Sequence, residues 1–178
     1  MIKSEGEPVI SSCTYGSGWV AGYYAQDACS LGSEVILKDF QFGVIRTTDI
    51  HFDDLHAIVG MAYPAMAYKD FTPFFDSLMK AKTFDHNIFA FYYSMNRIDK
   101  SELTLGDYNS QRLASDITWH KAVGKMYWAL ELDDILINGK SMQICKASPN
   151  DPRSCRIMPD SGTSYMTMPN WAYARFTA

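Results

Sequence analysis

The chain has 178 residues, of which 47% are hydrophobic and 20% are charged, a balance typical of a folded globular protein rather than a disordered one. Sixteen basic residues against 20 acidic ones leave a net charge of −4, which argues against a protein that binds nucleic acid or an anionic membrane surface. No apolar run approaches the roughly 20 residues of a membrane span, and the polar segment Met1–Pro8 lacks the apolar centre of a signal peptide.

Most segments of the chain have the pattern of short strands separated by turns. Ser11–Thr14 and Trp19–Ala25 flank Tyr15-Gly16-Ser17-Gly18, which predicts a β-hairpin with a glycine-rich tip. The segment Ile58–Ala62 is a compact apolar run and predicts a strand buried on both faces. Further strands are predicted at Glu34–Leu37, Phe40–Ile45, Ile88–Tyr93, Glu102–Leu105, Ile117–Trp119 and Met126–Leu132.

Two short helices interrupt these strands. Thr72 is a suitable N-cap and Pro73 suits the first helical position, and apolar residues then recur at helical spacing from Phe74 to Met79. Pro169 predicts the start of a second helix that runs to Phe176, and Asn138-Gly139 predicts a hairpin turn. The pattern as a whole is all-β with minor helices.

Chemistry is concentrated in Asp160-Ser161-Gly162-Thr163-Ser164. Gly162 allows a tight turn, and the neighbouring hydroxyls and backbone N–H groups can hydrogen-bond a carboxylate and favour its ionised form. The segment therefore suits the presentation of one oriented aspartate, although Asp-Ser-Gly is also common in ordinary surface turns. Likewise, the hairpin tip at Tyr15 suits a mobile aromatic lid or an ordinary turn.

Together these segments resemble the pepsin-like aspartic peptidases, the family of pepsin and cathepsin D. Tyr15–Gly18 is similar to the flap of that family and Asp160–Ser164 to its second catalytic loop. The resemblance extends over nearly the whole chain through Ile58-Val59-Gly60-Met61-Ala62-Tyr63-Pro64, Pro73–Leu78, Ile88–Tyr92, Leu105-Gly106-Asp107 and Tyr127-Trp128. It implies a pepsin-like bilobal β-barrel or sandwich, incomplete at both ends, with a partial N-terminal lobe at 1–112 and interdomain strands plus a partial C-terminal lobe at 113–178.

The resemblance also implies an aspartic endopeptidase, in which water is activated between two Asp carboxylates. Asp160 would be one of them, supported by Ser161, Gly162 and Thr163 in its loop. Flap residues Tyr15, Gly16 and Ser17 would close over an extended peptide or protein substrate, and Ile58 would line a substrate pocket.

Only one Asp-Ser-Gly loop is present in these 178 residues, whereas the family uses one Asp loop from each lobe. We therefore expect this fragment alone to be inactive. The alternative is a catalytically inactive member of the fold that binds peptide or protein. A homodimer of retroviral type is disfavoured, because such a protomer places its Asp early and Asp160 lies near the end.

Four cysteines without a CxxC spacing favour disulfides over a zinc site. By resemblance to the family we expect a Cys145–Cys155 bridge, the alternative being two reduced thiols. Cys13 and Cys29 could pair with each other or with a cysteine outside these residues. We expect no cofactor or metal, a monomer when full length, and a location in the secretory pathway, either extracellular or in a lysosome- or vacuole-like compartment.

Overall fold

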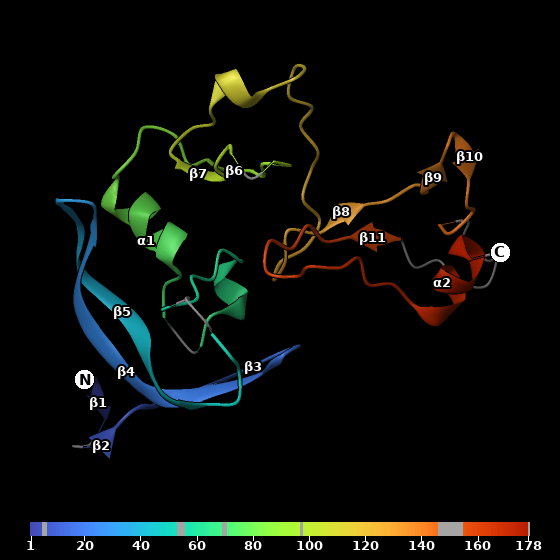
Figure 1. Ribbon diagram of the computed structural model, residues 1–178. Helices are drawn as coiled ribbons and strands as arrows, with labels where there is room; N and C mark the ends of the chain where they lie inside the picture. The colour runs from blue at the N-terminus through green and yellow to red at the C-terminus, as the bar shows by residue number, and fades with distance from the viewer. Residues whose placement is uncertain (5–6, 53–55, 69–70, 97, 146–154, 178) are drawn as a thin grey trace. The chain divides into compact units, whose positions relative to one another are not determined.

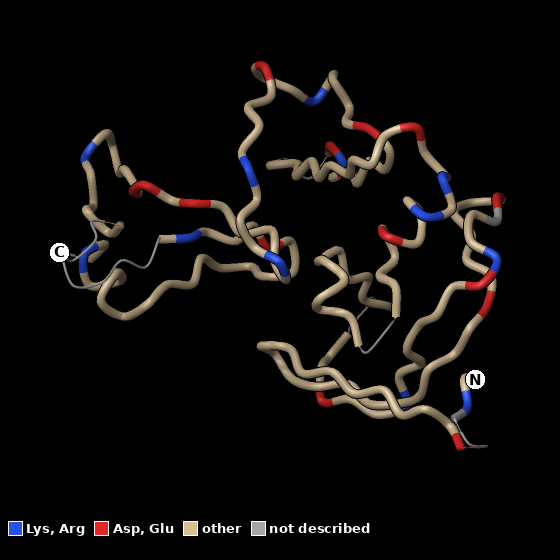
Figure 2. Tube along the Cα trace, turned by 180° about the vertical axis from the view of Figure 1, so that it is seen from behind, with Lys and Arg blue, Asp and Glu red and all other residues tan. Residues whose placement is uncertain are grey.

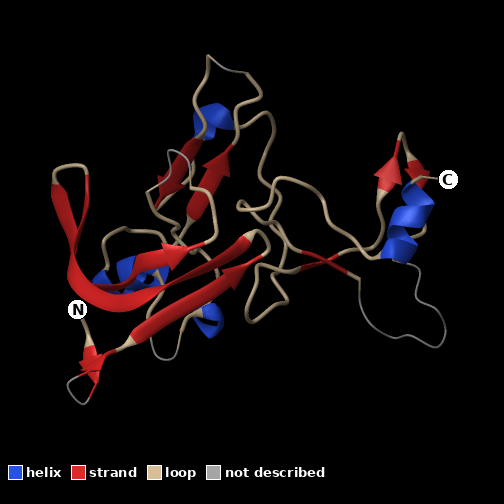
Figure 3. Cartoon of the chain, turned by 60° about the horizontal axis from the view of Figure 1, so that its bottom comes forward, coloured by secondary structure: helices blue, strands red, loops and turns tan. Residues whose placement is uncertain are grey.

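The computed structural model describes residues 1–4, 7–52, 56–68, 71–96, 98–145 and 155–177 (Figure 1). Strands outnumber helices among these residues, so the prediction of an all-β fold with minor helices is confirmed (Figure 3). The chain divides into two compact units, Met1–Asp116 and Ile117–Ala178. Each unit is described by itself.

The first unit is built on a three-stranded antiparallel sheet in the order β3-β4-β5. Strand β3 (Ile10–Tyr15) turns at Gly16-Ser17 into the long β4 (Gly18–Leu31), which confirms the predicted hairpin. The predicted strands at 34–37 and 40–45 are one continuous strand, β5 (Glu34–Thr48). Lys38 and Asp39 lie at a register shift between the pairs Cys29–Leu37 and Asp27–Phe40, and this irregularity does not end the strand. A small hairpin, β1 (Lys3–Ser4) with β2 (Glu7–Pro8), precedes the sheet.

Helix α1 (Phe74–Ala81) forms the core of this unit against β5. Its apolar residues share one face, and Leu78 is fully buried together with Phe75 and Leu37 of β5. Burial of a leucine contributes about 1.5–3 kcal/mol, so this contact fixes the helix on the sheet. The helix ends where Lys82 adopts the left-handed conformation (φ 53°) and its N–H donates to the Met79 carbonyl at 3.1 Å.

A second hairpin packs against the same core. Strand β6 (Phe89–Tyr92) pairs with β7 (Glu102–Leu105), and the Phe89 ring meets the Phe75 ring edge-on at 4.8 Å between centroids. Gly106 follows β7 with φ +84° and lies so close to Phe84 that a Cβ there would be 2.6 Å from the Phe84 Cβ. Only glycine fits this close approach.

An ion pair fastens the segment after β7. The Arg112 guanidinium lies 2.9 Å from Asp99 Oδ2 and 4.4 Å from the centroid of the Tyr92 ring. The Tyr92 hydroxyl donates to the same Asp99 oxygen at 2.9 Å, and these hydrogen bonds lower the pKa of Asp99. Short 3₁₀ helices occur at Pro64–Met66 and Ser110–Arg112. Figure 2 shows acidic and basic residues spread along the trace of both units.

The second unit contains two small antiparallel ladders and one helix. Strand β8 (Leu130–Glu131) pairs with β11 (Arg156–Ile157), and β9 (Leu136–Ile137) pairs with β10 (Lys140–Ser141). Asn138 and Gly139 both have positive φ at the turn between β9 and β10, which confirms the predicted hairpin. Helix α2 (Asn170–Phe176) begins after Pro169, as predicted.

Several predictions about local structure are wrong. Ile58–Ala62 is irregular, and Ile58 and Val59 are 46% and 57% exposed, because no strand within the described residues pairs with this run. Thr72 does not cap α1 and Pro73 is not its first residue, because Pro73 occupies the N-cap position and the helix begins at Phe74. Ile117–Trp119 is not a strand, and of Met126–Leu132 only the β8 pair is extended and paired.

Candidate active site

The Asp160 loop is a tight turn in the second unit that hydrogen-bonds its own aspartate. The Gly162 N–H donates to Asp160 Oδ1 at 2.8 Å, and the Thr163 hydroxyl donates to Oδ2 at 2.7 Å. Each carboxylate oxygen therefore has a donor, and these bonds fix the direction of the side chain. Asp160 itself is exposed. Among the described residues none hydrogen-bonds the Ser161 hydroxyl.

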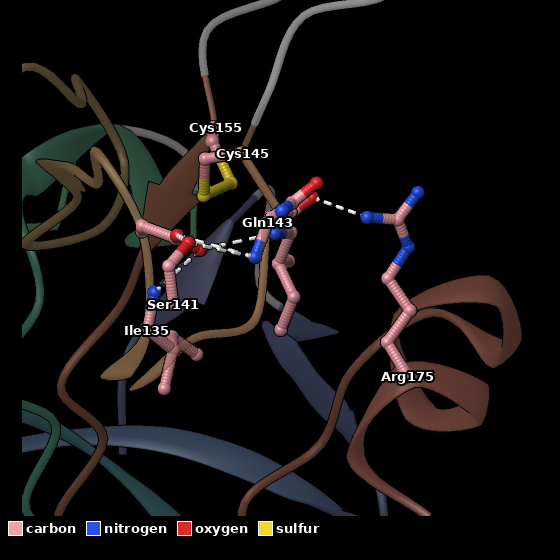
Figure 4. The surroundings of a disulfide bond; sticks show 8 residues. Ile135, Ser141, Gln143, Cys145, Cys155 and Arg175 are labelled. Carbon is pink, nitrogen blue, oxygen red and sulfur yellow. Dashed lines mark hydrogen bonds between the residues drawn. A yellow bond between two sulfur atoms is a disulfide. The ribbon is translucent and has the colours of Figure 1, made fainter. Parts of the chain in front are cut away.

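The loop follows directly on a covalently anchored strand. Ile157 and Arg156 of β11 pair with Leu130 and Glu131 of β8, and Leu132 N–H donates to the Cys155 carbonyl at 3.0 Å. Cys155 forms the predicted disulfide with Cys145, with 5.3 Å between the two Cα atoms (Figure 4). The strand that leads to Asp160 is thus held on one side by a ladder and at its start by a bridge.

Sequence reasoning missed a second organised carboxylate, Asp134. Its Oδ1 accepts the N–H groups of Ile135 at 2.9 Å and Ile144 at 3.0 Å. Its Oδ2 accepts the Ser141 hydroxyl and, at 3.1 Å, the Gln143 N–H. The hydrogen bond from Ser141, followed by those from backbone N–H groups, lowers the pKa of Asp134 to about 2.

Asp134 therefore closes the β9–β10 hairpin at its base, immediately before the disulfide. Arg175 of α2 reaches the same segment, with its Nη1 donating to the Gln143 carbonyl at 2.7 Å (Figure 4). The signal available in the sequence was an Asp four residues before an Asn-Gly turn, which is too common to single out.

The three residues predicted to form the flap lie at the tip of the β3–β4 hairpin. Tyr15 pairs with Gly18 across the turn, and Gly16 and Ser17 are exposed at its end. Tyr15 is 38% exposed, and burial together with a hydrogen bond to the Cys13 side chain raises its pKa to about 12. A protonated hydroxyl is therefore available at the tip throughout the acidic and neutral range.

The structure groups the candidates by unit. Asp160, Gly162 and Thr163 are brought together in the second unit, and Tyr15–Ser17 form one tip in the first. Ile58 lies in an irregular exposed segment of the first unit. Cys13 and Cys29 are unpaired thiols on β3 and β4, so they do not pair with each other.

The residues that the structure describes contain neither a candidate metal cluster nor a candidate membrane-spanning helix. There, no cluster of three or more His, Cys, Asp or Glu side chains could hold a metal ion. None of the described helices has the length and apolar character needed to cross a membrane.

An all-β fold with a Tyr-Gly-Ser-Gly hairpin and an Asp-Ser-Gly-Thr loop is the combination expected of an aspartic protease. Comparison with known families agrees: the family described as eukaryotic aspartyl protease matches residues 2–178, and this chain belongs to it.

Individual relatives are similar over most of this chain. Cathepsin D of Clupea harengus is 31% identical over 159 residues, which cover 87% of this chain and 38% of the relative. Gastricsin of Oryctolagus cuniculus is 28% identical over 89% of this chain and 40% of the relative, and cathepsin D of Homo sapiens is 29% identical over 87% and 40%. The chain thus spans about two fifths of the length of the curated relatives it matches.

Proposed function

We propose that this chain supplies the substrate-closing hairpin and one catalytic carboxylate, Asp160, of an acid endopeptidase. Membership of the aspartyl protease family supports the reaction class. The hydrogen-bonded Asp160 loop is the observation that carries the assignment to this chain, because both carboxylate oxygens have a donor from within the loop.

The proposed reaction needs a second carboxylate, from another Asp loop in the whole protein. Two carboxylates held close together cannot both ionise cheaply, so they share one proton. The ionised partner removes a proton from a bound water, which attacks the scissile carbonyl while the protonated partner hydrogen-bonds the carbonyl oxygen. Hydrogen bonds from Gly162 and Thr163 keep the Asp160 carboxylate in one orientation during both steps. Ser161 holds the two Asp loops against each other.

Substrate would be held as an extended peptide beneath the flap hairpin. Tyr15, Gly16 and Ser17 lie at a tip where backbone N–H and C=O groups can extend the substrate's own strand. The small residues at the tip let it approach the peptide closely, and the Tyr15 ring covers the peptide. Ile58, which is exposed, is proposed as part of the wall of a substrate pocket.

The disulfide supports a place for the whole protein in the secretory pathway, because such bonds persist in oxidising compartments. We propose that the full-length protein is a monomer that acts on peptide or protein substrates outside the cell or in a lysosome- or vacuole-like compartment.

The test is acid-pH cleavage of a denatured protein by the whole protein that contains this chain. Wild-type activity should disappear with pepstatin, and Asp160→Asn should lower it on the order of 10³-fold or more, since the amide cannot serve as the base. Asp133→Asn, at another aspartate of the second unit, is the matched control and should retain activity. Cleavage that survives Asp160→Asn would refute the assignment, and peptide binding without cleavage in the wild type would support the catalytically inactive alternative.

A further inference from the structure

Asp49, to which the proposed function gives no role, holds the base of the β3–β4 hairpin tip through a set of hydrogen bonds with Trp19, the clasp. It follows the last residue of β5 and lies beside Trp19, the second residue of β4. Asp49 Oδ1 accepts the Trp19 N–H at 2.5 Å, and the Asp49 N–H donates to the Trp19 carbonyl at 3.3 Å. Thr48 adds a hydroxyl that donates to the same carbonyl at 2.7 Å.

This clasp lies where the third strand ends. The last β4–β5 pair joins Val20 to Thr48, so the hairpin beyond Val20 consists of β3 and β4 alone. A two-stranded ribbon is at best marginally stable in water. The hydrogen bonds of Asp49 therefore hold β4 for one residue beyond the last β4–β5 pair, at Trp19. Among the described residues, none outside the hairpin gives the turn at Gly16-Ser17 such support.

The neighbouring glycine is fitted to the clasp. Gly18 has φ +148°, and a Cβ at this position would collide with Asp49 Oδ1 and come within 2.9 Å of Ile50 Cγ1. The Ile50 N–H in turn donates to the Thr48 hydroxyl at 2.9 Å, which fixes the bend of the chain just after β5. The absence of a side chain at Gly18 thus makes room for the carboxylate of Asp49.

We propose that Asp49 is a positioning residue that sets the hinge of the flap at Trp19 and so determines how firmly the tip closes on a bound peptide. This rests on the proposed function of the hairpin as a flap. Asp49 acts through the backbone of Trp19 and need not touch the substrate. Its carboxylate makes a charge-assisted hydrogen bond, which is among the stronger kinds in proteins.

The first experiment measures amide hydrogen exchange at residues 14–19 in this chain. Asp49→Ala should speed exchange at the Trp19 amide by about tenfold or more, because a hydrogen bond to a charged group is lost. Asp49→Asn keeps an uncharged acceptor and should rescue much of this change. Asp39→Ala is the matched control, because Asp39 is an exposed aspartate of β5 that accepts a hydrogen bond from the Gln26 side chain and not from Trp19. It should leave residues 14–19 unchanged.

The second experiment uses the whole protein and a peptide substrate. A looser hinge should raise KM several-fold for Asp49→Ala with little change in kcat, whereas Asp39→Ala should change neither. Unchanged exchange at Trp19 in Asp49→Ala, or an equal effect of Asp39→Ala, would overturn the hinge. Faster exchange at Trp19 combined with an unchanged KM would instead overturn the flap role and leave the clasp intact.

Discussion

Asp134 is predicted to keep the β9–β10 hairpin closed in acid well below the pH at which ordinary aspartates are protonated. The hydrogen bond from Ser141 and those from three backbone N–H groups lower its pKa from 3.8 to about 2. Because the folded pKa lies below the unfolded value, its contribution to stability is complete above about pH 4 and is lost as the pH falls toward 2. The hairpin should therefore open with a midpoint near pH 2.

The measurement is a pH titration of the Gln143 and Ile144 amide resonances, both of which report hydrogen bonds to this carboxylate. Ser141→Ala removes the largest cause of the shift and should move the midpoint up toward the ordinary value of 3.8. Asp134→Asn leaves one acceptor oxygen for four donors, so the hairpin should be loosened at every pH.

Asp133→Asn, at the preceding residue, is the control and should leave both resonances and their midpoint unchanged. A midpoint near 3.8 in the unmodified chain would refute the reasoning, because it would mean that the four hydrogen bonds do not favour the ionised form of Asp134. A midpoint that Ser141→Ala fails to move would refute the ranking of causes.

Three further outcomes are expected. Leu78→Ala should cost about 3 kcal/mol of stability and lower the melting temperature by roughly 10 °C, because Leu78 is fully buried in the core. Lys80→Ala, at an exposed position of the same helix, should change the stability by no more than about 0.5 kcal/mol. Equal effects of the two substitutions in a thermal melt would contradict the packing of α1. An alkaline difference spectrum of the chain against Tyr15→Phe should show the Tyr15 hydroxyl ionising near pH 12, and Cys13→Ala should lower that pKa. Because the folded pKa of Tyr15 lies above the unfolded one, the contribution of Tyr15 to stability is lost as the pH rises from 10 to 12. The 178-residue chain alone should cleave no denatured protein at acidic pH, and cleavage that vanishes in Asp160→Ala would show that one carboxylate suffices.

Local patterns predicted the elements whose cause is local. The β3–β4 hairpin and the Asn138-Gly139 turn follow from residues that tolerate positive φ or tight turns, and α1 follows from apolar spacing within eight residues. The strand at Ile58–Ala62 could not be settled in this way, because an apolar run becomes a strand only where another strand offers hydrogen bonds.

The same limit applies to the candidate site. The Asp160 loop was predictable, because its donors at Gly162 and Thr163 lie within three residues of the carboxylate. The clasp of Asp49 on Trp19 was not, because its partners are 30 residues apart and meet only once β4 and β5 are in register. Asp134 was missed for a similar reason, since the donor Ile144 lies ten residues away.

The Cys145–Cys155 bridge preserves the covalent continuity of the second unit even if the backbone between the two cysteines is cut. Their sequence separation is 10, and hydrolysis of any one peptide bond within that interval leaves both products attached through sulfur. A nicked chain would therefore migrate with the intact one until a reductant is added. In surroundings rich in proteolytic activity, this keeps the strand before Asp160 tethered to the hairpin closed by Asp134.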